Sequence, residues 1–420
     1  MVVKKVPGEI IERLGDMLER YPTPINIYHE KGMRGTIRRF NTAFSWVPGG
    51  FKNYFAVKAA PLPIILSMFA EEGAGTDCSS MPELIMSERV GITGPNAIFT
   101  SNDTPTEEFR KANEMGAIIN LDDIEHIPIL LNDVGVPETI CFRFNPGKER
   151  TGNAIIGDPV EAKYGLTRKQ IFEAYRRMKE AGSKRFGLHT MVASNELNAN
   201  YFVETGRMLI DLVVELSGAV GIEFDFINLG GGVGVPYRPE QEEVDIEFVA
   251  GEIKKIYQNR FEGTGIKLPR IVMECGRVMT GPHAWLATTV RHVAEKHKTY
   301  VGLDACMADF ARPGAYGPDC YHHITVLGKD NKSRQKMVDV TGSLCENCDK
   351  FAVDRTLPVM ERGDIVFIYD TGAHGRPMGS NYNGKLRCGE VMLREDGSIA
   401  LLRRPETIEE YLAPFAWPEG

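Results

Sequence analysis

From residue 53 onward the chain alternates between short apolar runs and helix-length amphipathic stretches. Apolar and β-branched residues form eight runs, at 54–58, 75–78, 97–101, 117–122, 140–145, 187–192, 226–231 and 271–275. The stretches between them have the spacing of helices, for example 63–72, 82–90 and 106–115. Strands that alternate with helices form βαβ units and a parallel sheet. Eight such units predict an α/β barrel, because an open doubly wound sheet usually has fewer strands and a recognisable nucleotide-binding turn.

After about residue 286 the pattern changes to strand-like runs separated by Gly, Asp and Pro turns. These runs predict a second, mostly β domain, and the N-terminal run PINIYHE could add one strand to it. We therefore expect a (β/α)8 TIM-like barrel at residues 31–285. The mostly β C-terminal domain would consist of residues 1–30 and 286–420.

The composition is that of a globular chain with a small-molecule partner. Among 420 residues, 43% are hydrophobic and 25% are charged, close to average globular usage. The formal net charge of −8 disfavours attraction to nucleic acid or anionic lipid. The N-terminus lacks an apolar stretch of signal-peptide length, and nowhere do about 18 apolar residues run uninterrupted. We expect a cytoplasmic protein that binds neither nucleic acid nor membrane.

Eight cysteines are spread between Cys78 and Cys388. Without a secretory signal they are expected to be reduced thiols. Cys345 and Cys348 form a C-x-x-C pair, but no second close pair with nearby histidines completes the about four ligands of a zinc site. We therefore expect no metal, and a redox role for this pair is the alternative.

Polar residues gather at the C-terminal ends of the predicted barrel strands, where the loops of such barrels build the active site. In chain order they are Lys58, Asp77, Ser101, Asn102, Asp122, Arg143, Asn145, His189, Gly230, Gly231, Gly232, Glu274 and Arg277. Lys58 follows the apolar run YFAV, so burial would depress the pKa of its amine and make it a nucleophile suited to a Schiff base. The alternative is a strand-end lysine that extends to solvent.

The run INLGGGVGVPY predicts a loop that binds phosphate. Three consecutive glycines after a strand let backbone N–H groups approach an anion closely. The run does not match the dinucleotide fingerprint G-x-G-x-x-G, because Pro236 and Tyr237 stand where the helix and the third glycine belong. A turn that needs glycine only for its backbone geometry is the alternative.

The motif MECGR places Glu274 and Arg277 three residues apart at the end of the eighth run. A carboxylate that faces a pyridine nitrogen keeps that nitrogen protonated, which favours carbanion formation. An ion pair that only holds a loop is the alternative. His189 could stack on a cofactor ring or move protons, although a histidine at a strand end is often simply hydrogen-bonded.

In order and separation, these motifs resemble those of the alanine-racemase-like, fold-type III pyridoxal-phosphate decarboxylases, and most closely the diaminopimelate decarboxylases. The resemblance spans nearly the whole chain. It is carried by the stretches YFAVKA, GAGTDCSS, HTMVAS, NLGGGVG, MECGR, DACMADFARPGAYG, GSLCENCDKF and GAHGRPMGSNYNGKLR.

The resemblance implies pyridoxal 5'-phosphate as the cofactor. It further implies that Lys58 forms a Schiff base with the cofactor, that His189 stacks on the ring and that Glu274 pairs with the pyridine nitrogen. The implied cofactor-binding residues are Lys58, Asp77, His189, Ser194, Gly230, Gly231, Gly232, Glu274, Gly276, Arg277, His374 and Tyr382, with the glycine triplet at the phosphate.

The resemblance also implies a homodimer with shared active sites. Cys345 and Glu346 would reach into the site of the neighbouring subunit. Near the cofactor, the Cys345 thiol could return a proton after carbon dioxide leaves, which would make Cys345 catalytic together with Lys58 and His189. The alternative for Cys345 is a buried, inert cysteine.

Three positions depart from the family pattern. Ser194 lies five residues after His189, where the family has a spacing of three. Cys275 replaces the usual proline between glutamate and glycine. His374 stands where the family commonly has a tyrosine that touches the cofactor, and Tyr382 follows nearby.

Charge predicts the substrate. Diaminopimelate carries a second amino-acid head, whose carboxylate suits arginine and whose ammonium suits an acid. Substrate-binding residues would be Arg277, Arg312, Tyr316 and Glu346. We expect decarboxylation of meso-2,6-diaminopimelate to L-lysine and carbon dioxide. The alternatives are the same chemistry on lysine, ornithine, arginine or carboxynorspermidine, and a non-catalytic regulatory relative; Glu274 argues against a racemase.

Overall fold

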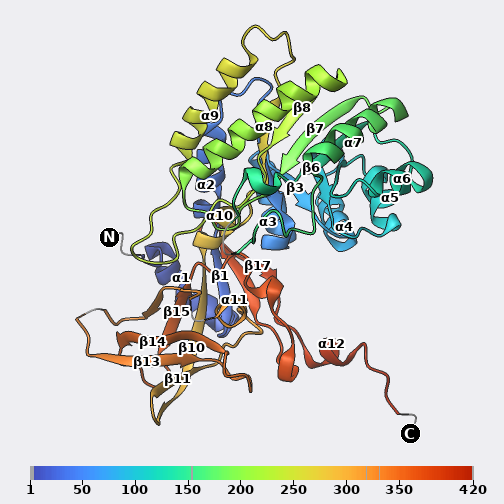
Figure 1. Cartoon of the computed structure of the whole chain (residues 1–420). Coiled ribbons are helices and arrows are strands. Elements are labelled where there is room, and N and C mark those ends of the chain that lie inside the picture. The colour runs from blue at the N-terminus through green and yellow to red at the C-terminus, as the bar shows by residue number, and fades with distance from the viewer. Residues whose placement is uncertain (1–3, 153–154, 318, 331, 419–420) are drawn as a thin grey trace. The chain divides into compact units, whose positions relative to one another are not determined.

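The computed structural model describes residues 4–152, 155–317, 319–330 and 332–418. Within these ranges, eight parallel strands close into a barrel, each paired with the next and the last with the first (Figure 1). They are β2 (Phe51–Ala56), β3 (Gly75–Cys78), β4 (Ala97–Thr100), β5 (Ile118–Leu121), β6 (Thr139–Phe144), β7 (Arg185–Thr190), β8 (Phe224–Asn228) and β9 (Arg270–Met273). Each of the eight apolar runs overlaps one of these strands, so the predicted barrel is confirmed.

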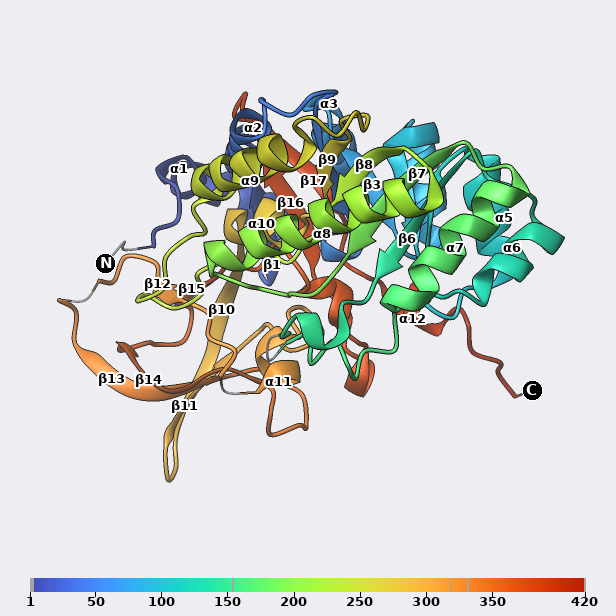
Figure 2. The ribbon, with the colours of Figure 1, turned by 45° about the horizontal axis from the view of Figure 1, so that its top comes forward.

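Helices cover the outside of the barrel (Figure 1). They are α2 (Glu30–Ala43), α3 (Pro63–Glu71), α4 (Met81–Arg89), α5 (Thr106–Glu114), α6 (His126–Asp133), α7 (Arg168–Ala181), α8 (Ala199–Val220) and α9 (Ile246–Phe261). The three helices predicted from their spacing are confirmed as α3, α4 and α5. Local sequence sets the helix ends: Thr167 and Gln170 form a capping box before α7, and Gly182 ends that helix in the left-handed region. The long helices α8 and α9 lie side by side (Figure 2).

Side chains fill the interior of the barrel. One buried cluster takes a residue from each of six different strands, namely Tyr54, Ile98, Ile118, Cys141, Phe226 and Val272. Such an interior is a packed core and not a pore. The chemistry therefore belongs at the strand ends and in the loops that follow them.

A second sheet forms the mostly β part that the sequence predicts. Its hydrogen-bonded order is β14-β13-β11-β10-β1-β16-β17, and β15 pairs with both β10 and β12. The strands are β1 (Ile25–His29), β10 (Ala284–Glu295), β11 (Thr299–Leu303), β12 (Ile324–Val326), β13 (Gln335–Thr341), β14 (Lys350–Pro358), β15 (Ile365–Tyr369), β16 (Gly389–Leu393) and β17 (Ile399–Arg403). The N-terminal run PINIYHE supplies β1, as expected, where Ile25 pairs antiparallel with Ala287 and parallel with Gly389.

Contacts divide the chain into two compact units. The barrel unit consists of Arg34–Val235 and Glu242–Met279, and the β-sheet unit of Met1–Met33, Pro236–Gln241 and Thr280–Gly420. Sequence reasoning did not indicate that the short segment after the glycine run belongs with the sheet. The remaining helices are α1 (Gly8–Arg20), α10 (Arg277–Thr280), α11 (Arg312–Tyr316) and α12 (Ile408–Leu412). In the described part of the chain, no helix is long and apolar enough to cross a membrane.

Candidate active site

Lys58 lies just beyond the first barrel strand, in a single 3₁₀ turn (Val57–Ala59). The strand ends at Ala56, so Lys58 does not itself end the strand as the sequence indicated. Val57 and Ala59 are buried, whereas the Lys58 side chain is exposed. The tight turn sends successive side chains in different directions, and the predicted burial of the lysine amine is therefore not observed.

Glu274 is the centre of a buried polar cluster in the barrel unit. Asn228 Nδ2 donates to Glu274 Oε1 at 2.6 Å, and His189 Nε2 lies 3.1 Å from Glu274 Oε2. Burial alone would raise the pKa of Glu274, but His189, Lys58 and Asn228 together hold that pKa below its ordinary value. Glu274 is therefore a preformed carboxylate with cationic and hydrogen-bonding groups around it.

Asp77 is the second buried carboxyl of this cluster, and its pKa is shifted in the opposite direction to that of Glu274. Burial raises the pKa of Asp77 well above its ordinary value, repulsion by Glu274 adds to this effect, and Lys58 opposes it. Within the described residues, Asp77 Oδ1 has no hydrogen-bond partner. The pKa values of these two carboxyls are thus shifted in opposite directions, which suits different roles toward a ligand.

Sequence reasoning missed Asn120, which fixes the ring of His189. The Asn120 amide Nδ2 lies 2.9 Å from His189 Nδ1 and 3.0 Å from Thr100 Oγ1. The ring is thus held from both sides, by Glu274 at Nε2 and by Asn120 at Nδ1, and the direction of the Asn120 hydrogen bond depends on the tautomer of the ring.

The glycine run passes so close to neighbouring backbone that side chains cannot replace it. A Cβ atom at Gly230, Gly231 or Gly232 would come within 2.5 Å of a carbonyl oxygen, and Gly230 and Gly232 have φ values of +69° and +89°. Asn228 Oδ1 accepts from Gly230 N at 3.0 Å, while Gly231 N donates to the weak acceptor Met191 Sδ. This geometry suits a loop whose N–H groups bind an anion.

Cys275, the residue that replaces the family proline, is held by Asn53. Asn53 Nδ2 donates to the Cys275 carbonyl at 3.0 Å, and Cys275 N donates to Asn53 Oδ1 at 2.8 Å. A proline at this position would have no N–H to donate. The neighbouring Gly276 packs against the Lys58 turn, since a Cβ there would lie 2.8 Å from Ala59 Cβ.

The altered loop after His189 still brings Ser194 to Arg277. Arg277 Nη2 donates to Ser194 Oγ at 3.3 Å, and Arg277 is 7% exposed. Arg277 and Glu274 flank the clamped Cys275 on one loop. The unusual spacing of Ser194 therefore does not remove it from the group of candidate residues.

Further polar residues at the strand ends hold the loop after β6, although the charges of Asp122 and Arg143 also act on His189 and Asp77. Arg143 Nη1 lies 3.4 Å from Asp122 Oδ1, and its guanidinium stacks 3.7 Å from the centre of the Tyr164 ring. Asn145 Nδ2 donates to the carbonyls of Pro159 and Tyr164 at 2.9 and 3.1 Å. These contacts hold the loop after β6. Ser101 makes local contacts: its Oγ donates to the Asn102 carbonyl at 3.5 Å, and its carbonyl accepts from Thr104 Oγ1 at 3.0 Å.

The remaining predicted site residues belong to the β-sheet unit. Cys345 N donates to Asn383 Oδ1 at 2.9 Å, and Cys345 Sγ lies 3.5 Å from Tyr382 Oη. Hydrogen bonds from Tyr382 and Asn383 lower the pKa of the Cys345 thiol, and contact with Cys345 and Glu346 raises the pKa of Tyr382 to about 12. The chain thus brings Cys345, Glu346 and Tyr382 together on its surface.

Arg312 is a buried guanidinium without a carboxylate partner in the described residues. It is 4% exposed, and it lies 5.0 Å from the Tyr237 ring and 5.2 Å from the Tyr316 ring. Its Nη2 contacts Cys320 Sγ at 3.8 Å, and its Nε has no hydrogen-bond partner among the described atoms. A buried charge in such surroundings is stabilised when an anion binds it.

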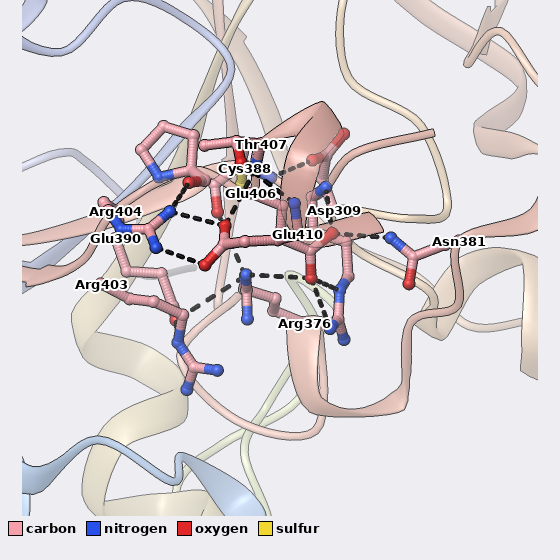
Figure 3. A network of polar contacts seen from close by, with 12 residues as sticks. Asp309, Arg376, Asn381, Cys388, Glu390, Arg403, Arg404, Glu406, Thr407 and Glu410 are labelled. Carbon is pink, nitrogen blue, oxygen red and sulfur yellow. Dashed lines mark hydrogen bonds and ion pairs between the residues drawn. The ribbon is translucent and has the colours of Figure 1, made fainter. Parts of the chain in front are cut away.

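A network of ion pairs anchors the loop that carries His374 and Tyr382 (Figure 3). Arg376 Nε donates to the Cys388 carbonyl at 3.1 Å, and Asn381 Nδ2 donates to Glu406 Oε2 at 2.6 Å. His374 itself has a φ of +52°, which few residues other than glycine adopt. Contacts of Arg376 and Asn381, which lie between His374 and Tyr382, therefore hold this loop.

Comparison with known proteins gives consistent matches over almost the whole chain. A family model described as "Pyridoxal-dependent decarboxylase, pyridoxal binding domain" matches residues 33–281. Protein TabA of Pseudomonas amygdali pv. tabaci is 39% identical over 404 residues, covering 96% of this chain and 94% of that protein. The diaminopimelate decarboxylase of Methanothermobacter thermautotrophicus is 31% identical over 401 residues, covering 94% and 92%.

The solved structures agree with these matches. A diaminopimelate decarboxylase from M. jannaschii has a TM-score of 0.88 at 28% identity, covering 96% of this chain and 94% of that one. The same enzyme in complex with L-lysine has a TM-score of 0.87 at 27% identity, with the same coverage.

Proposed function

This chain belongs to the fold-type III pyridoxal-dependent decarboxylases, and from that premise we propose that it converts meso-2,6-diaminopimelate to L-lysine and carbon dioxide. A diaminopimelate decarboxylase is among its relatives at 31% identity, and a similar enzyme has been solved with L-lysine bound. Protein TabA, at 39% identity, has a name that specifies no substrate. The substrate therefore has to be argued from the site.

The residues of the barrel unit fit pyridoxal phosphate. We assign Lys58 to the covalent link, the glycine triplet to the phosphate and Glu274 to the pyridine nitrogen. A glycine loop with no room for Cβ atoms and a buried carboxylate with a lowered pKa are the features that support this assignment. When bound, the cofactor withdraws electrons from the C–C bond that breaks.

Arg312 is the single observation that carries the choice of substrate. A buried guanidinium near two tyrosine rings, with no carboxylate partner in the described residues, would be stabilised by a bound anion. Diaminopimelate has a distal carboxylate after its first one is lost, whereas lysine and ornithine offer only a distal cation. An arginine built for a carboxylate would be left unpaired by those amino acids, which disfavours them.

Cys345 is the group that we assign to the return of a proton to the substrate carbon. A thiol with a lowered pKa beside the Tyr382 hydroxyl can lose and regain a proton readily. Glu346, its neighbour in sequence, is exposed and could bind the distal ammonium. As the resemblance implies, we propose that these residues serve the site of a second copy in a homodimer.

The experiment is carbon dioxide release and lysine formation from meso-diaminopimelate, with pyridoxal phosphate supplied. Lysine in equal amount to carbon dioxide supports the proposal, and Lys58→Ala should abolish both. A panel of lysine, ornithine, arginine and carboxynorspermidine tests the other substrates. Turnover of one of these in preference to diaminopimelate would overturn the substrate while leaving the family unchanged.

Arg312→Gln sharpens the test. It keeps the side chain polar but removes the charge, so kcat/KM for diaminopimelate should fall by about 100-fold, a cost of about 2.7 kcal/mol for one lost charged contact. Arg355→Gln is the matched control, because Arg355 also stacks on a tyrosine of this unit without a carboxylate partner in the described ranges. An equal loss in both variants would argue against a specific role of Arg312.

A further inference from the structure

The pair Cys345 and Cys348 is set apart from the other cysteines by exposure. Both side chains are exposed, whereas Cys78, Cys141, Cys275, Cys306 and Cys388 are buried and Cys320 is intermediate. A thiol must be accessible and partly ionised to react with oxidants. Of these two thiols, the proposed decarboxylation uses only Cys345, so Cys348 has no assigned role.

Both thiols lie on one short loop whose end is fixed by Asp349. Asp349 Oδ2 accepts from Leu344 N at 2.8 Å, and Asp349 Oδ1 accepts from Met307 N at 2.9 Å. The loop turns between Glu346 and Asp349, where Asp349 N donates to the Glu346 carbonyl at 3.0 Å. With two residues between them on an anchored turn, the two sulfur atoms have a high effective concentration toward each other.

The two sulfur atoms have different surroundings. Cys345 Sγ lies 3.5 Å from the Tyr382 hydroxyl, and the backbone N–H of Cys345 donates to Asn383 Oδ1. Among the described side chains, the polar contact of Cys348 Sγ is with the thioether of Met307, at 4.0 Å. A hydroxyl beside sulfur stabilises a thiolate, and a thioether does not. Cys345 is therefore the nucleophile of the pair, and Cys348 is placed to resolve its oxidised form.

We propose that Cys345 and Cys348 form a reversible disulfide under mild oxidation by a hydroperoxide, which switches off the proposed decarboxylase. The Cys345 thiolate attacks one oxygen of hydrogen peroxide, the O–O bond breaks, and a sulfenic acid and hydroxide result. Cys348 sulfur then attacks that sulfur, the S–O bond breaks, and the oxygen leaves as water. In the overall reaction, the two thiols give two electrons and two protons to hydrogen peroxide. The products are one disulfide and two water molecules.

The consequence for activity rests on the proposed role of Cys345, but the disulfide itself does not. A sulfur bound in a disulfide can neither donate nor accept the proton that Cys345 is proposed to return. Turnover should therefore fall by about 100-fold or more, the usual contribution of a positioned proton donor. Reduction of the disulfide should restore it fully.

The test is peptide mapping of the pyridoxal-phosphate-loaded protein after treatment with one equivalent of hydrogen peroxide. Trypsin releases residues 337–350, MVDVTGSLCENCDK, which contain both cysteines and no other. After alkylation, this peptide should be two hydrogen atoms lighter than its reduced form and carry no label. Free thiols should fall from the eight of the sequence to six, and dithiothreitol should reverse both changes.

Two variants control the test. Cys348→Ser should retain the starting turnover but lose the disulfide, so that excess peroxide adds oxygen atoms to Cys345 and inactivates the enzyme irreversibly. Asn347→Ala changes the same exposed loop without removing a thiol and should still form the disulfide. Two alkylated cysteines after peroxide, or a bond from Cys345 to another cysteine, would overturn the proposal.

The mapping distinguishes failure of this proposal from failure of the proposed function. The peptide mass needs no substrate, so it supports or overturns the disulfide even when no amino acid tested is decarboxylated. A disulfide that forms while diaminopimelate turnover stays unchanged would overturn the switch.

Discussion

The two groups of candidate residues differ in how the chain holds them. In the barrel unit, His189, Asn228 and Glu274 are no more than 7% exposed, and the first two both contact Glu274 directly. In the β-sheet unit, Cys345 and Glu346 are exposed and Tyr382 is 47% exposed. Electrostatic preorganisation requires groups fixed away from water, which the barrel group provides. The exposed group is the kind that a substrate or a second subunit completes.

Removal of one carboxylate from each group should show the largest contrast. Glu274→Ala leaves His189 and Asn228 buried without their partner, so we expect it to lower the free energy of unfolding by about 3 kcal/mol. Glu346→Ala, at an exposed position, should leave that free energy unchanged. Urea unfolding of both variants without cofactor measures the difference, and a similar loss in both would show that the two groups are held alike.

The Asn53 clamp should be the next most sensitive feature. Asn53→Ala leaves the buried N–H and carbonyl of Cys275 without their partners, at a cost of about 2 kcal/mol in unfolding free energy. Because the clamp holds the loop of Glu274 and Arg277, affinity for pyridoxal phosphate should fall as well. Asn347→Ala, at an exposed asparagine, is the control, and equal cofactor affinity in both variants would contradict the assignment.

The barrel could be predicted because its strands are short, largely apolar runs that alternate regularly with stretches of helix length. The motifs also located Lys58, His189 and Glu274 near strand ends, since the chain order of a barrel brings successive strand ends together. The 3₁₀ turn that exposes Lys58 could not be predicted, because it depends on how Val57 and Ala59 pack.

The residues that sequence reasoning missed are three asparagines in barrel strands. Asn53, Asn120 and Asn228 are each 1% exposed or less and bind, respectively, the backbone of Cys275, the ring of His189 and the carboxylate of Glu274. An asparagine within or directly beside an apolar run was the available signal, because a buried amide must find partners. The identity of those partners depends on contacts between strands far apart in sequence.

Within the buried group, Asp77 should make stability depend on pH. Because burial, aided by repulsion from Glu274, raises its pKa, the folded protein binds this proton more tightly than the unfolded chain does. The stability that protonated Asp77 contributes is therefore fully present below a pH of about 3.9, the ordinary pKa of an aspartate. It is lost as the pH rises towards the pKa that Asp77 has in the folded protein. Asp77→Asn cannot ionise, so it should gain stability relative to the unchanged protein as pH rises.

Urea midpoints of the two proteins at a series of pH values measure this effect. Asp396→Asn is the matched control, because hydrogen bonds from Ser398 lower the pKa of that exposed aspartate. Asp396→Asn should gain no stability relative to the unchanged protein as the pH rises. A constant difference between Asp77→Asn and the unchanged protein at every pH would contradict the raised pKa.

The smallest expected effect lies in the exposed group, where Tyr382→Phe should make the Cys345 thiol less reactive. Hydrogen bonds, first from Tyr382 and then from Asn383, lower the pKa of this thiol, so loss of the hydroxyl should raise it. Less thiolate is then present at neutral pH, and the pH midpoint of iodoacetamide labelling should move upward. Mass measurement of peptide 337–350 in a Cys348→Ser background follows Cys345 alone. Tyr316→Phe, whose hydroxyl contacts Met378 instead, should leave the midpoint unchanged, and equal behaviour of the two variants would show that Tyr382 does not act on this thiol.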